Sequence, residues 1–472
     1  QNFLSDLSCD ADDWFRRHLS VHGQTPQSSL KPATWAAAWI WLTGMGWLLH
    51  LPRTAFIPLW AVYSLVFMAY VWMAFRKDGP DLKQGLWIAL AGHLLTLFFS
   101  PQLSDDLYRF IWDGMVMQGG IHPMAYTPEY LVQHPDILSV PQGLYEMLNS
   151  KTYYSVYPPV LQSLFLVSYL IAGAGIAGNV LFLKSILLLV QGLILFLLYR
   201  LAGIMKTDQR QILLFALNPL MILEYPGNLH MDTLMIAGLL AALLLSFRSS
   251  AWWSGLAMAL SILSKLVTVI LIPFFPRQMY WNKMIVFGLF TILISSLIIW
   301  CSFGQHNGWL ESVGLWFHSF EFNASLYYLA KAAGYAVYGY NRIAFIGPLL
   351  AALTAGGILW IWWMYLYRKR MDWSHAMLYA LTLYLLLSTT VHPWYLGLLL
   401  TLSVISGHLF PVVWTYLVVL SYSHYDGGGY QEKYGLIAIE YLLLLSWMWV
   451  EWKYISPKKS VTDKDIDSVA IE

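Results

Sequence analysis

The chain has 472 residues, of which 58% are hydrophobic and only 11% are charged, whereas an ordinary soluble domain has about 25% charged residues. Apolar runs of about 20 residues, long enough to cross a bilayer, recur from Thr34 to the region of Val450 and exclude a water-soluble fold. A formal net charge of +1 argues against nucleic acid as a partner, and two cysteines exclude a disulfide framework or a thiolate metal cluster.

The hydrophobic runs predict an all-α, polytopic membrane protein with about 11 to 14 transmembrane helices. Residues 1–32 lack the apolar core of a signal peptide, so a polar cytoplasmic segment is expected there. Residues 33–455 are expected to form a single membrane domain that includes a long outer loop at 102–177, and residues 456–472 a polar cytoplasmic tail. The candidate spans are 33–51, 56–75, 85–101, 178–200, 210–224, 230–247, 251–264, 266–276, 284–303, 343–367, 374–391, 394–410, 411–424 and 435–452.

Lysine and arginine residues between the spans indicate the orientation of the chain. With both termini in the cytoplasm, the basic clusters all lie inside, as the positive-inside rule requires. This orientation requires two apolar stretches, 160–176 and 325–340, to lie along the outer surface or to re-enter without crossing. The unusual polar residues then fall outside, and we expect them to surround one polar site. They are Asp105, Asp106, Arg109, Asp113, Glu224, His230, Asp232, Lys265, Glu321, Asn323, His392 and Asp426.

The long outer loop is expected to open with a helix whose N-cap is Ser104. Asp105 and Asp106 would then lie in the first turn, where the helix dipole favours carboxylates. Asp106, Arg109 and Asp113 would share one face of this helix, so an ion pair is expected there. The two aspartates are either capping and surface charges, or one of them is a general base for a sugar hydroxyl. For Arg109 and Asp113 a structural and a functional role are both open.

Polar and aromatic residues continue through the loop and into the next pair of spans. Tyr157 can either line a pocket for a sugar or prenyl chain or anchor the loop at the interface. Glu224, His230 and Asp232 lie in a polar corner between two apolar helices, where the last two would serve acceptor hydroxyls. The alternative is that Asn228 and Asp232 cap the next helix. His-x-Asp offers only two metal ligands, too few to define a metal site.

Lys265 separates two short apolar segments, where a lysine without an anion is costly. It would either bind a phosphate or extend to the outer headgroups. Asn323 and His392 also place polar groups beside aromatic residues, and His392 is either an interfacial histidine or a ligand. The chain lacks a phosphate-binding loop, a His-Glu-x-x-His helix and a Gly-x-Ser-x-Gly elbow. It also lacks a clear duplication of halves, which argues against a secondary transporter.

Taken in order, these motifs resemble those of the polyprenol-phosphate-mannose-dependent mannosyltransferases of the GT-C superfamily. The likeness covers residues 85–400 and implies a fold in which outer helices enclose a pocket between donor and acceptor. The motifs are Ser104-Asp105-Asp106, Trp112-Asp113-Gly114, Gly120-Ile121-His122-Pro123, Tyr157-Pro158-Pro159, Asn218-Pro219, Gly227-Asn228-Leu229-His230-Met231-Asp232, Lys265-Leu266-Val267, Phe322-Asn323-Ala324-Ser325-Leu326 and His392-Pro393-Trp394-Tyr395.

The resemblance implies inverting transfer of a hexose, expected to be mannose, from a polyprenyl-phosphate donor to a hydroxyl of a glycan or glycolipid. The reaction would take place at the extracytoplasmic face of a bacterial cytoplasmic membrane. Asp105 or Asp106 would be the base, with Asp105 favoured, and Lys265 with Arg109 would stabilise the departing phosphate. The expected substrate-binding residues are Asp113, Tyr157, Glu224, His230, Asp232, Asn323 and His392. No nucleotide sugar is needed, while the acceptor, the linkage, a divalent metal and the oligomeric state stay open.

Two other functions would use similar residues. A lipid-glycan transporter or flippase would guide a phosphorylated lipid across the bilayer, but it predicts polar residues through the membrane depth rather than at one face. A glycan polymerase or ligase would share the outer site and the lipid substrate and would join longer saccharides. Its loop motifs differ from those found here.

Overall fold

A computed structural model describes residues 31–455 except 249, 277–280, 304–307, 309, 310, 313, 315–318, 369, 370 and 428. In this part of the chain the secondary structure is helical, apart from one parallel bridge between Phe322 and Thr390. The all-α prediction is therefore confirmed. The predicted polar segment at 1–32 lies outside the described residues except for Lys31 and Pro32, and the predicted tail at 456–472 lies wholly outside them.

Five of the described helices are long and apolar enough to cross a membrane, which confirms a polytopic protein. A sixth span exists if a pair of helices bent by 113° is counted as one. Five further apolar helices have 10–17 residues, and four of them correspond to spans that the sequence predicted at 85–101, 251–264, 374–391 and 394–410. The five long helices are α3 (Phe56–Phe75), α9 (Ile176–Ile204), α14 (Trp281–Phe303), α17 (Ile343–Trp363) and α21 (Tyr434–Val450).

The remaining helices of the bundle are shorter, and several follow one another after a break. The amino-terminal group is α2 (Pro32–Leu48), α4 (Leu82–Leu95) and η1 (Thr96–Phe98). The middle group is η2 (Gln209–Ile212), α10 (Leu213–Ala216), α11 (Pro219–Ile222), η3 (Leu223–Gly227), α12 (Asp232–Phe247), α13 (Ala251–Ser264) and η4 (Leu266–Phe274). The carboxyl-terminal group is α16 (Leu326–Tyr338), η5 (Met364–Arg368), α18 (Trp373–Leu387), η6 (Pro393–Tyr395), α19 (Leu396–Ser406), α20 (Phe410–Leu417), η7 (Val418–Tyr425) and η8 (Glu451–Ile455).

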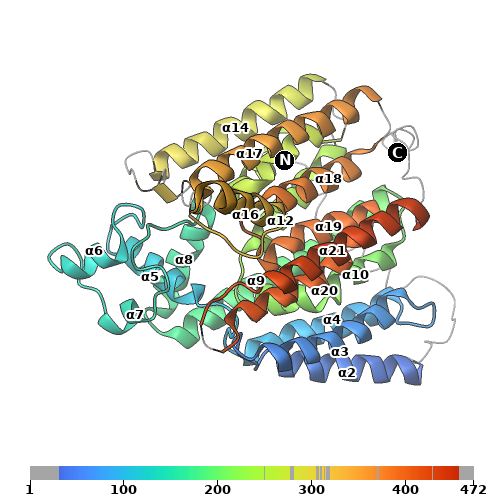
Figure 1. The fold of residues 1–472 in the computed structure, drawn as a ribbon, viewed down its shortest axis with the longest axis horizontal. Coiled ribbons are helices and arrows are strands. Elements are labelled where there is room, and N and C mark those ends of the chain that lie inside the picture. Colours follow the sequence, from blue (N-terminus) through green and yellow to red (C-terminus); the bar gives the residue numbers. More distant parts are fainter. Residues whose placement is uncertain are drawn as a thin grey trace, which may run out of the picture.

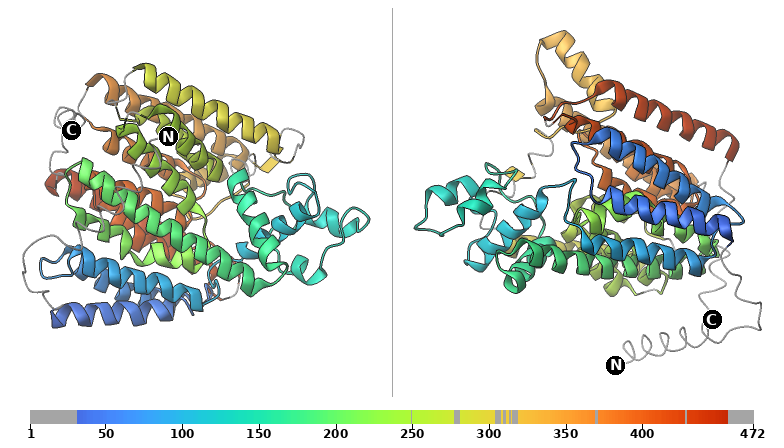
Figure 2. Two further views of the ribbon diagram at one scale, coloured as in Figure 1. Left: turned by 180° about the vertical axis from the view of Figure 1, so that it is seen from behind. Right: turned by 90° about the horizontal axis from the view of Figure 1, so that it is seen from below.

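A lobe of four helices projects from one end of the bundle (Figure 1). It consists of α5 (Asp106–Gln118), α6 (Pro128–Gln133), α7 (Gln142–Glu146) and α8 (Pro159–Ala172). The views from behind and from below show the same projection (Figure 2). The lobe corresponds to the long loop that the sequence predicted at 102–177, and α8, with 14 residues, is too short to span a bilayer without thinning it.

The buried apolar side chains form two separate clusters. The larger cluster runs through the bundle, and the smaller one joins the lobe to α9 and to two residues of the corner before α12, Leu229 and Met231. In the lobe, the rings of Phe110 and Phe165 stack with centroids 4.4 Å apart. Gly114 allows this close packing, because a Cβ atom there would lie 2.4 Å from the carbonyl oxygen of Phe165.

The corner between η3 and α12 bends the chain by 113°. Pro226 lies inside η3 and has no amide hydrogen to donate, so regular helical hydrogen bonding fails there. Leu229 then adopts a positive φ of 63°, which is strained for a branched side chain and is held by its complete burial in the lobe cluster. The corner is thus fixed by packing against the lobe.

Candidate active site

The first turn of α5 carries the two candidate bases. The helix begins one residue later than predicted, with Asp105 at the N-cap position, while Ser104 Oγ accepts a hydrogen bond from the Asp106 amide at 3.3 Å. The carboxylate of Asp105 forms an ion pair with Arg53, which lies in the turn between α2 and α3. The carboxylate of Asp106 accepts a weaker hydrogen bond from Asn149 Nδ2 at 3.3 Å. The two neighbouring carboxylates therefore have different surroundings.

Asn228 fixes the backbone just before these aspartates. Its Oδ1 accepts hydrogen bonds from the amides of Gln102 at 3.0 Å and Leu103 at 2.8 Å, and its Nδ2 donates to the Leu223 carbonyl at 2.7 Å. The alternative that Asn228 caps α12 is wrong, because the N-cap position of that helix is Met231. Asn228 instead ties the polar corner to the entrance of the lobe.

Lys184 holds the preceding turn from inside the bundle. Its side chain, on α9, is fully buried and donates to the carbonyls of Thr96 at 2.8 Å and Phe99 at 2.7 Å. These two carbonyls belong to η1 and to the residue that ends it. Carbonyl groups at the end of a helix have no hydrogen-bond donor within the helix, and Lys184 supplies one. The segment that leads into the candidate bases is thus fastened to α9.

Arg109 and Asp113 form the ion pair that the sequence predicted on this helix. Arg109 Nε lies 2.8 Å from Asp113 Oδ1, and only 4% of the arginine side chain and none of the aspartate are exposed. Arg109 Nη1 also donates to the carbonyls of Ser150 at 3.1 Å and Tyr153 at 3.0 Å, and Ser155 Oγ donates to Asp113. Burial raises the pKa of Asp113, and the Arg109 charge opposes that rise. This pair braces the lobe, because it binds the segment 150–155 to α5.

Lys265 lies at the break between α13 and η4, where the backbone is extended. Its Nζ is 2.5 Å from Asp232 Oδ1 in the first turn of α12 and 3.9 Å from the centroid of the Tyr395 ring. The lysine side chain is 29% exposed, whereas the aspartate is only 10% exposed. The Asp232 carboxylate therefore holds the Lys265 ammonium in place, while part of the lysine side chain stays accessible.

Four stacked rings form a wall beside Lys265. Trp394 lies between two imidazoles, with its centroid 3.5 Å from that of His230 and 4.3 Å from that of His392. Phe322 stacks on the other face of His392 at 4.5 Å. Burial lowers the pKa of His392 well below its usual value, and the neighbouring His230 and Lys265 charges lower it further. His392 is therefore neutral near pH 7.

Glu224 and Asn323 anchor the two ends of this wall. His230 Nδ1 lies 3.0 Å from both the backbone carbonyl oxygen and Oε2 of Glu224, and the hydroxyl of Tyr422 donates to Glu224 Oε1. Asn323, with a positive φ of 47°, directs its amide to Glu440 on α21 at 3.1 Å. Glu224 and Asn323 each contact other residues of the protein, so they help to hold the stacked rings in position.

Electrostatic coupling links the lobe to the Lys265 side of the site. Burial raises the pKa of the Tyr395 phenol, and the charges of Asp232 and Asp106 raise it further. Burial raises the pKa of Tyr157, and the charges of Asp106 and Asp113 raise it further. The charge of Asp106, on α5, therefore reaches Tyr395, the residue whose ring lies beneath the Lys265 ammonium.

A family model described as "Alpha-(1->6)-mannopyranosyltransferase, N-terminal domain" matches residues 23–281 of this chain. The match covers more than half of the 472 residues and includes the lobe, the polar corner and Lys265. The chain belongs to this family of mannosyltransferases. The predicted resemblance is confirmed, and the protein is a glycosyltransferase that transfers mannose. No curated protein and no solved structure matches the chain.

Several residues of this candidate site were not singled out from the sequence. Arg53 and Asn149, which contact the two aspartates, come from separate loops, and only the outer position of Arg53 between two spans could have indicated it. Trp394 and Tyr395 were part of a motif but had no role assigned. Lys184 was read only as part of an apolar span.

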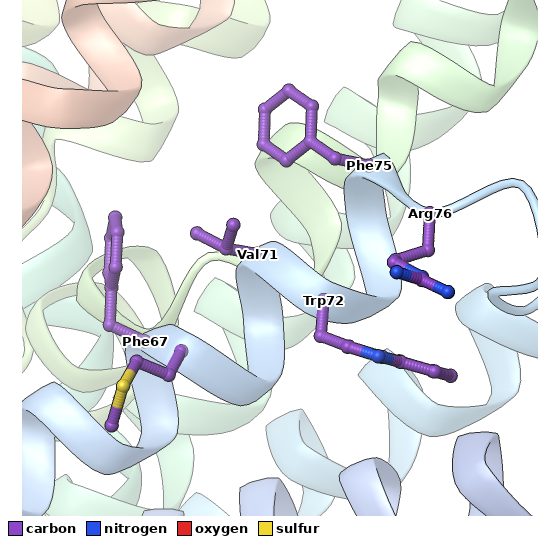
Figure 3. Close-up of a pocket in the computed structure, with 6 residues that line it drawn as sticks. Phe67, Val71, Trp72, Phe75 and Arg76 are labelled. Atoms are coloured by element: carbon purple, nitrogen blue, oxygen red, sulfur yellow. The ribbon is translucent and has the colours of Figure 1, made fainter.

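The mannosyltransferase also has a surface hollow that is separate from this site (Figure 3). It is lined by Phe67, Met68, Val71, Trp72, Phe75 and Arg76. These residues lie toward the end of α3 opposite the Arg53 turn, and they include none of the candidate site residues. Among the described residues, no three His, Cys, Asp or Glu side chains are grouped so that they could hold a metal ion.

Proposed function

We propose that this mannosyltransferase takes mannose from a polyprenyl-phosphate donor and transfers it with inversion to an acceptor hydroxyl at the extracytoplasmic face. The observation that carries the proposal is that Lys265 Nζ is held by Asp232 and lies 3.9 Å from the centroid of the Tyr395 ring, whose phenol also feels the charge of Asp106. A carboxylate that accepts a proton and a cation that receives a phosphate are the two groups that such a displacement needs. The protein would be integral to the membrane, with both termini in the cytoplasm.

The proposed step is a single displacement at the anomeric carbon. The carboxylate takes the proton of the acceptor hydroxyl, the acceptor oxygen forms a bond to C1, and the bond between C1 and the phosphate oxygen breaks. The electron pair leaves with polyprenyl phosphate, whose charge is stabilised by Lys265. The family description names an alpha-(1->6) linkage, so we propose the 6-hydroxyl of a mannose as the acceptor. Inversion to an α product then requires a β-linked donor.

The surroundings of the two aspartates favour Asp106 as the base, whereas the sequence favoured Asp105. Asp105 is paired with Arg53, which occupies one carboxylate oxygen and neutralises its charge. Among the described residues, the Asp106 carboxylate accepts a hydrogen bond from the Asn149 amide and forms no ion pair, and its charge acts on Tyr157, Tyr395 and Tyr425. A general base must be free to reach the proton of its substrate.

A lipid-borne donor accounts for the distribution of apolar surface. Helices that would face lipid, such as α14 and α17, expose large side chains including Trp300 and Trp360. A prenyl chain can stay in the bilayer beside such helices while its phosphate reaches Lys265. The sugar hydroxyls would then contact His230, Asp232, His392 and Tyr157. In such a site the polar atoms at the edges of the rings form hydrogen bonds with the sugar.

The test is transfer of radiolabelled mannose by the purified protein in liposomes, with an α-linked mannose oligosaccharide as acceptor. Parallel reactions would use β- and α-linked polyprenyl-phosphate mannose and GDP-mannose as donors, each with and without EDTA. We expect α-linked product from the β-linked lipid donor alone, formed only when the acceptor is outside a right-side-out vesicle. The EDTA arm decides whether a divalent ion is needed.

Three variants make the test specific to the base. Asp106→Asn should remove transfer, and Asp105→Asn should reduce it less. Asp136→Asn, an exposed aspartate of the same lobe, is the matched control and should behave as the wild type. Use of the nucleotide sugar, retention of configuration, or equal activity in the three variants would reject the proposal. Movement of the lipid donor across the bilayer without transfer would favour a flippase instead.

A further inference from the structure

Arg53 lies in the short turn between α2 and α3, far in the sequence from the lobe. Its guanidinium forms the ion pair with Asp105, and its backbone amide donates to the Gln102 carbonyl at 3.4 Å. The same guanidinium lies 4.8 Å from the centroid of the Tyr425 ring at the end of η7. Three separate segments therefore meet at this arginine, directly beside the candidate bases.

We propose that Arg53 is a positioning residue, which binds and neutralises Asp105 so that Asp106 alone acts as the base. This inference rests on the proposed function above. Two adjacent carboxylates at a helix start repel each other, and each makes ionisation of the other less favourable. A cation on one of them removes most of this repulsion. It also fixes the first turn of α5 and hence the direction of the neighbouring carboxylate.

The exposure of the pair suits this role. The side chain of Arg53 is 29% exposed and that of Asp105 is 42% exposed, so the pair is partly accessible to solvent. A partly exposed ion pair contributes little to the stability of a fold. The principal effect of Arg53 is therefore expected on the charge and geometry of the site.

Charged and titratable groups from several elements of the described structure act on or feel the two carboxylates. Asp105 faces Arg53 from the turn and Tyr425 from η7. Asp106 acts on Tyr157 from the lobe, on Tyr395 from η6 and on Tyr425. Burial raises the pKa of Tyr425, so its phenol is neutral near pH 7. Arg53 is thus the cation placed to compensate Asp105.

The experiment is the pH dependence of kcat/KM for mannose transfer by the full-length protein in liposomes, in wild type, Arg53→Gln, Asp105→Asn and the double variant. In Arg53→Gln the uncompensated Asp105 should move the acidic limb to higher pH by about one unit. In Asp105→Asn the limb should move to lower pH, because Arg53 then acts on Asp106 alone. The double variant should return to near the wild-type limb.

Two further variants separate this effect from a general loss of structure. Arg53→Lys keeps the charge and should restore the wild-type limb, although it loses the planar guanidinium. Arg342→Gln is the matched control, because Arg342 also lies over an aromatic ring, 4.3 Å from the Tyr338 centroid. It should leave the pH profile unchanged.

Several results would overturn the inference. One is a uniform loss of activity in Arg53→Gln with an unshifted acidic limb, and another is a shift that persists in the double variant. Should Arg53→Gln fail to fold, Asp105→Asn still tests the inference, since an upward or absent shift rejects it. A wild-type protein that does not transfer mannose, or an active Asp106→Asn, would instead reject the proposed function.

Discussion

Lys265 and Asp232 form an ion pair with 2.5 Å between Nζ and Oδ1, although 33 residues separate them in the sequence. The pair joins two helix ends: Asp232 begins α12, and Lys265 follows α13. An anion at a helix start is favoured by the helix dipole, so the aspartate is a stable partner for the lysine. The ammonium is thereby held in position before any substrate phosphate arrives.

Replacing Lys265 by Met should lower kcat/KM by about a hundredfold, as loss of one donor to a developing negative charge does in other enzymes. Lys265→Arg should retain more activity because it keeps the charge. Lys151→Met is the matched control, since Lys151 also lies over a tyrosine ring, 5.0 Å from the Tyr145 centroid. Equal losses in the Lys265 and Lys151 variants, measured as mannose transfer, would contradict a role in phosphate binding.

Replacing Asp113 by Asn should destabilise the lobe by about 3–5 kcal/mol, because the buried Arg109 charge loses its partner. Thermal unfolding in detergent, with limited proteolysis of the lobe as a second measurement, would show this. A double variant, Arg109→Met with Asp113→Leu, should be less destabilised than the single change. A single variant as stable as the wild type would show that the pair does not brace the lobe.

The lowered pKa of His392 predicts a pH-dependent stability. Below about pH 6.5 the unfolded chain protonates this histidine while the folded protein does not, so folding stability should fall as the pH decreases. The slope is at most about 1.4 kcal/mol per pH unit. His392→Gln should reduce the slope of Tm between about pH 7.5 and pH 5. An unchanged slope would place the histidine in contact with water.

Replacing Trp394 by Leu should separate the two imidazoles and remove two ring contacts, each worth about 0.5–1.5 kcal/mol. We expect a lower Tm and a higher KM for the acceptor or the donor. Trp394→Phe keeps an aromatic ring and should lie between the wild type and the leucine variant in both measurements. Kinetics that are unchanged in both variants would assign the stack to structure alone.

The sequence predicted the class of fold and the Arg109–Asp113 pair, because hydropathy and helical spacing depend on local residues. Lys265 was placed at a break between two short helices, as the structure has it. The predicted run 251–264 forms a helix of 14 residues with the same bounds, which is shorter than the five described helices long enough to cross a membrane alone.

The contacts between segments could not be predicted in the same way. The Arg53–Asp105 pair joins positions 52 residues apart, and the Tyr422–Glu224 contact joins positions 198 residues apart. No local pattern encodes such distances, because they depend on how the helices pack. The same limit explains why a helix cap was the structural alternative considered for Asn228, whereas its side chain binds the backbone of residues 102 and 103.

The small apolar cluster shared by the lobe and the polar corner implies an order of unfolding. Leu229 and Met231 pack with the inner faces of α5 and α8, while the rest of the bundle has its own, much larger core. A cluster of this size forms a cooperative unit that can open while the other helices stay intact. Warming should therefore release the candidate bases and the His230 side of the site together. Inactivation would precede loss of helicity, and cooling would restore both halves of the site in one step.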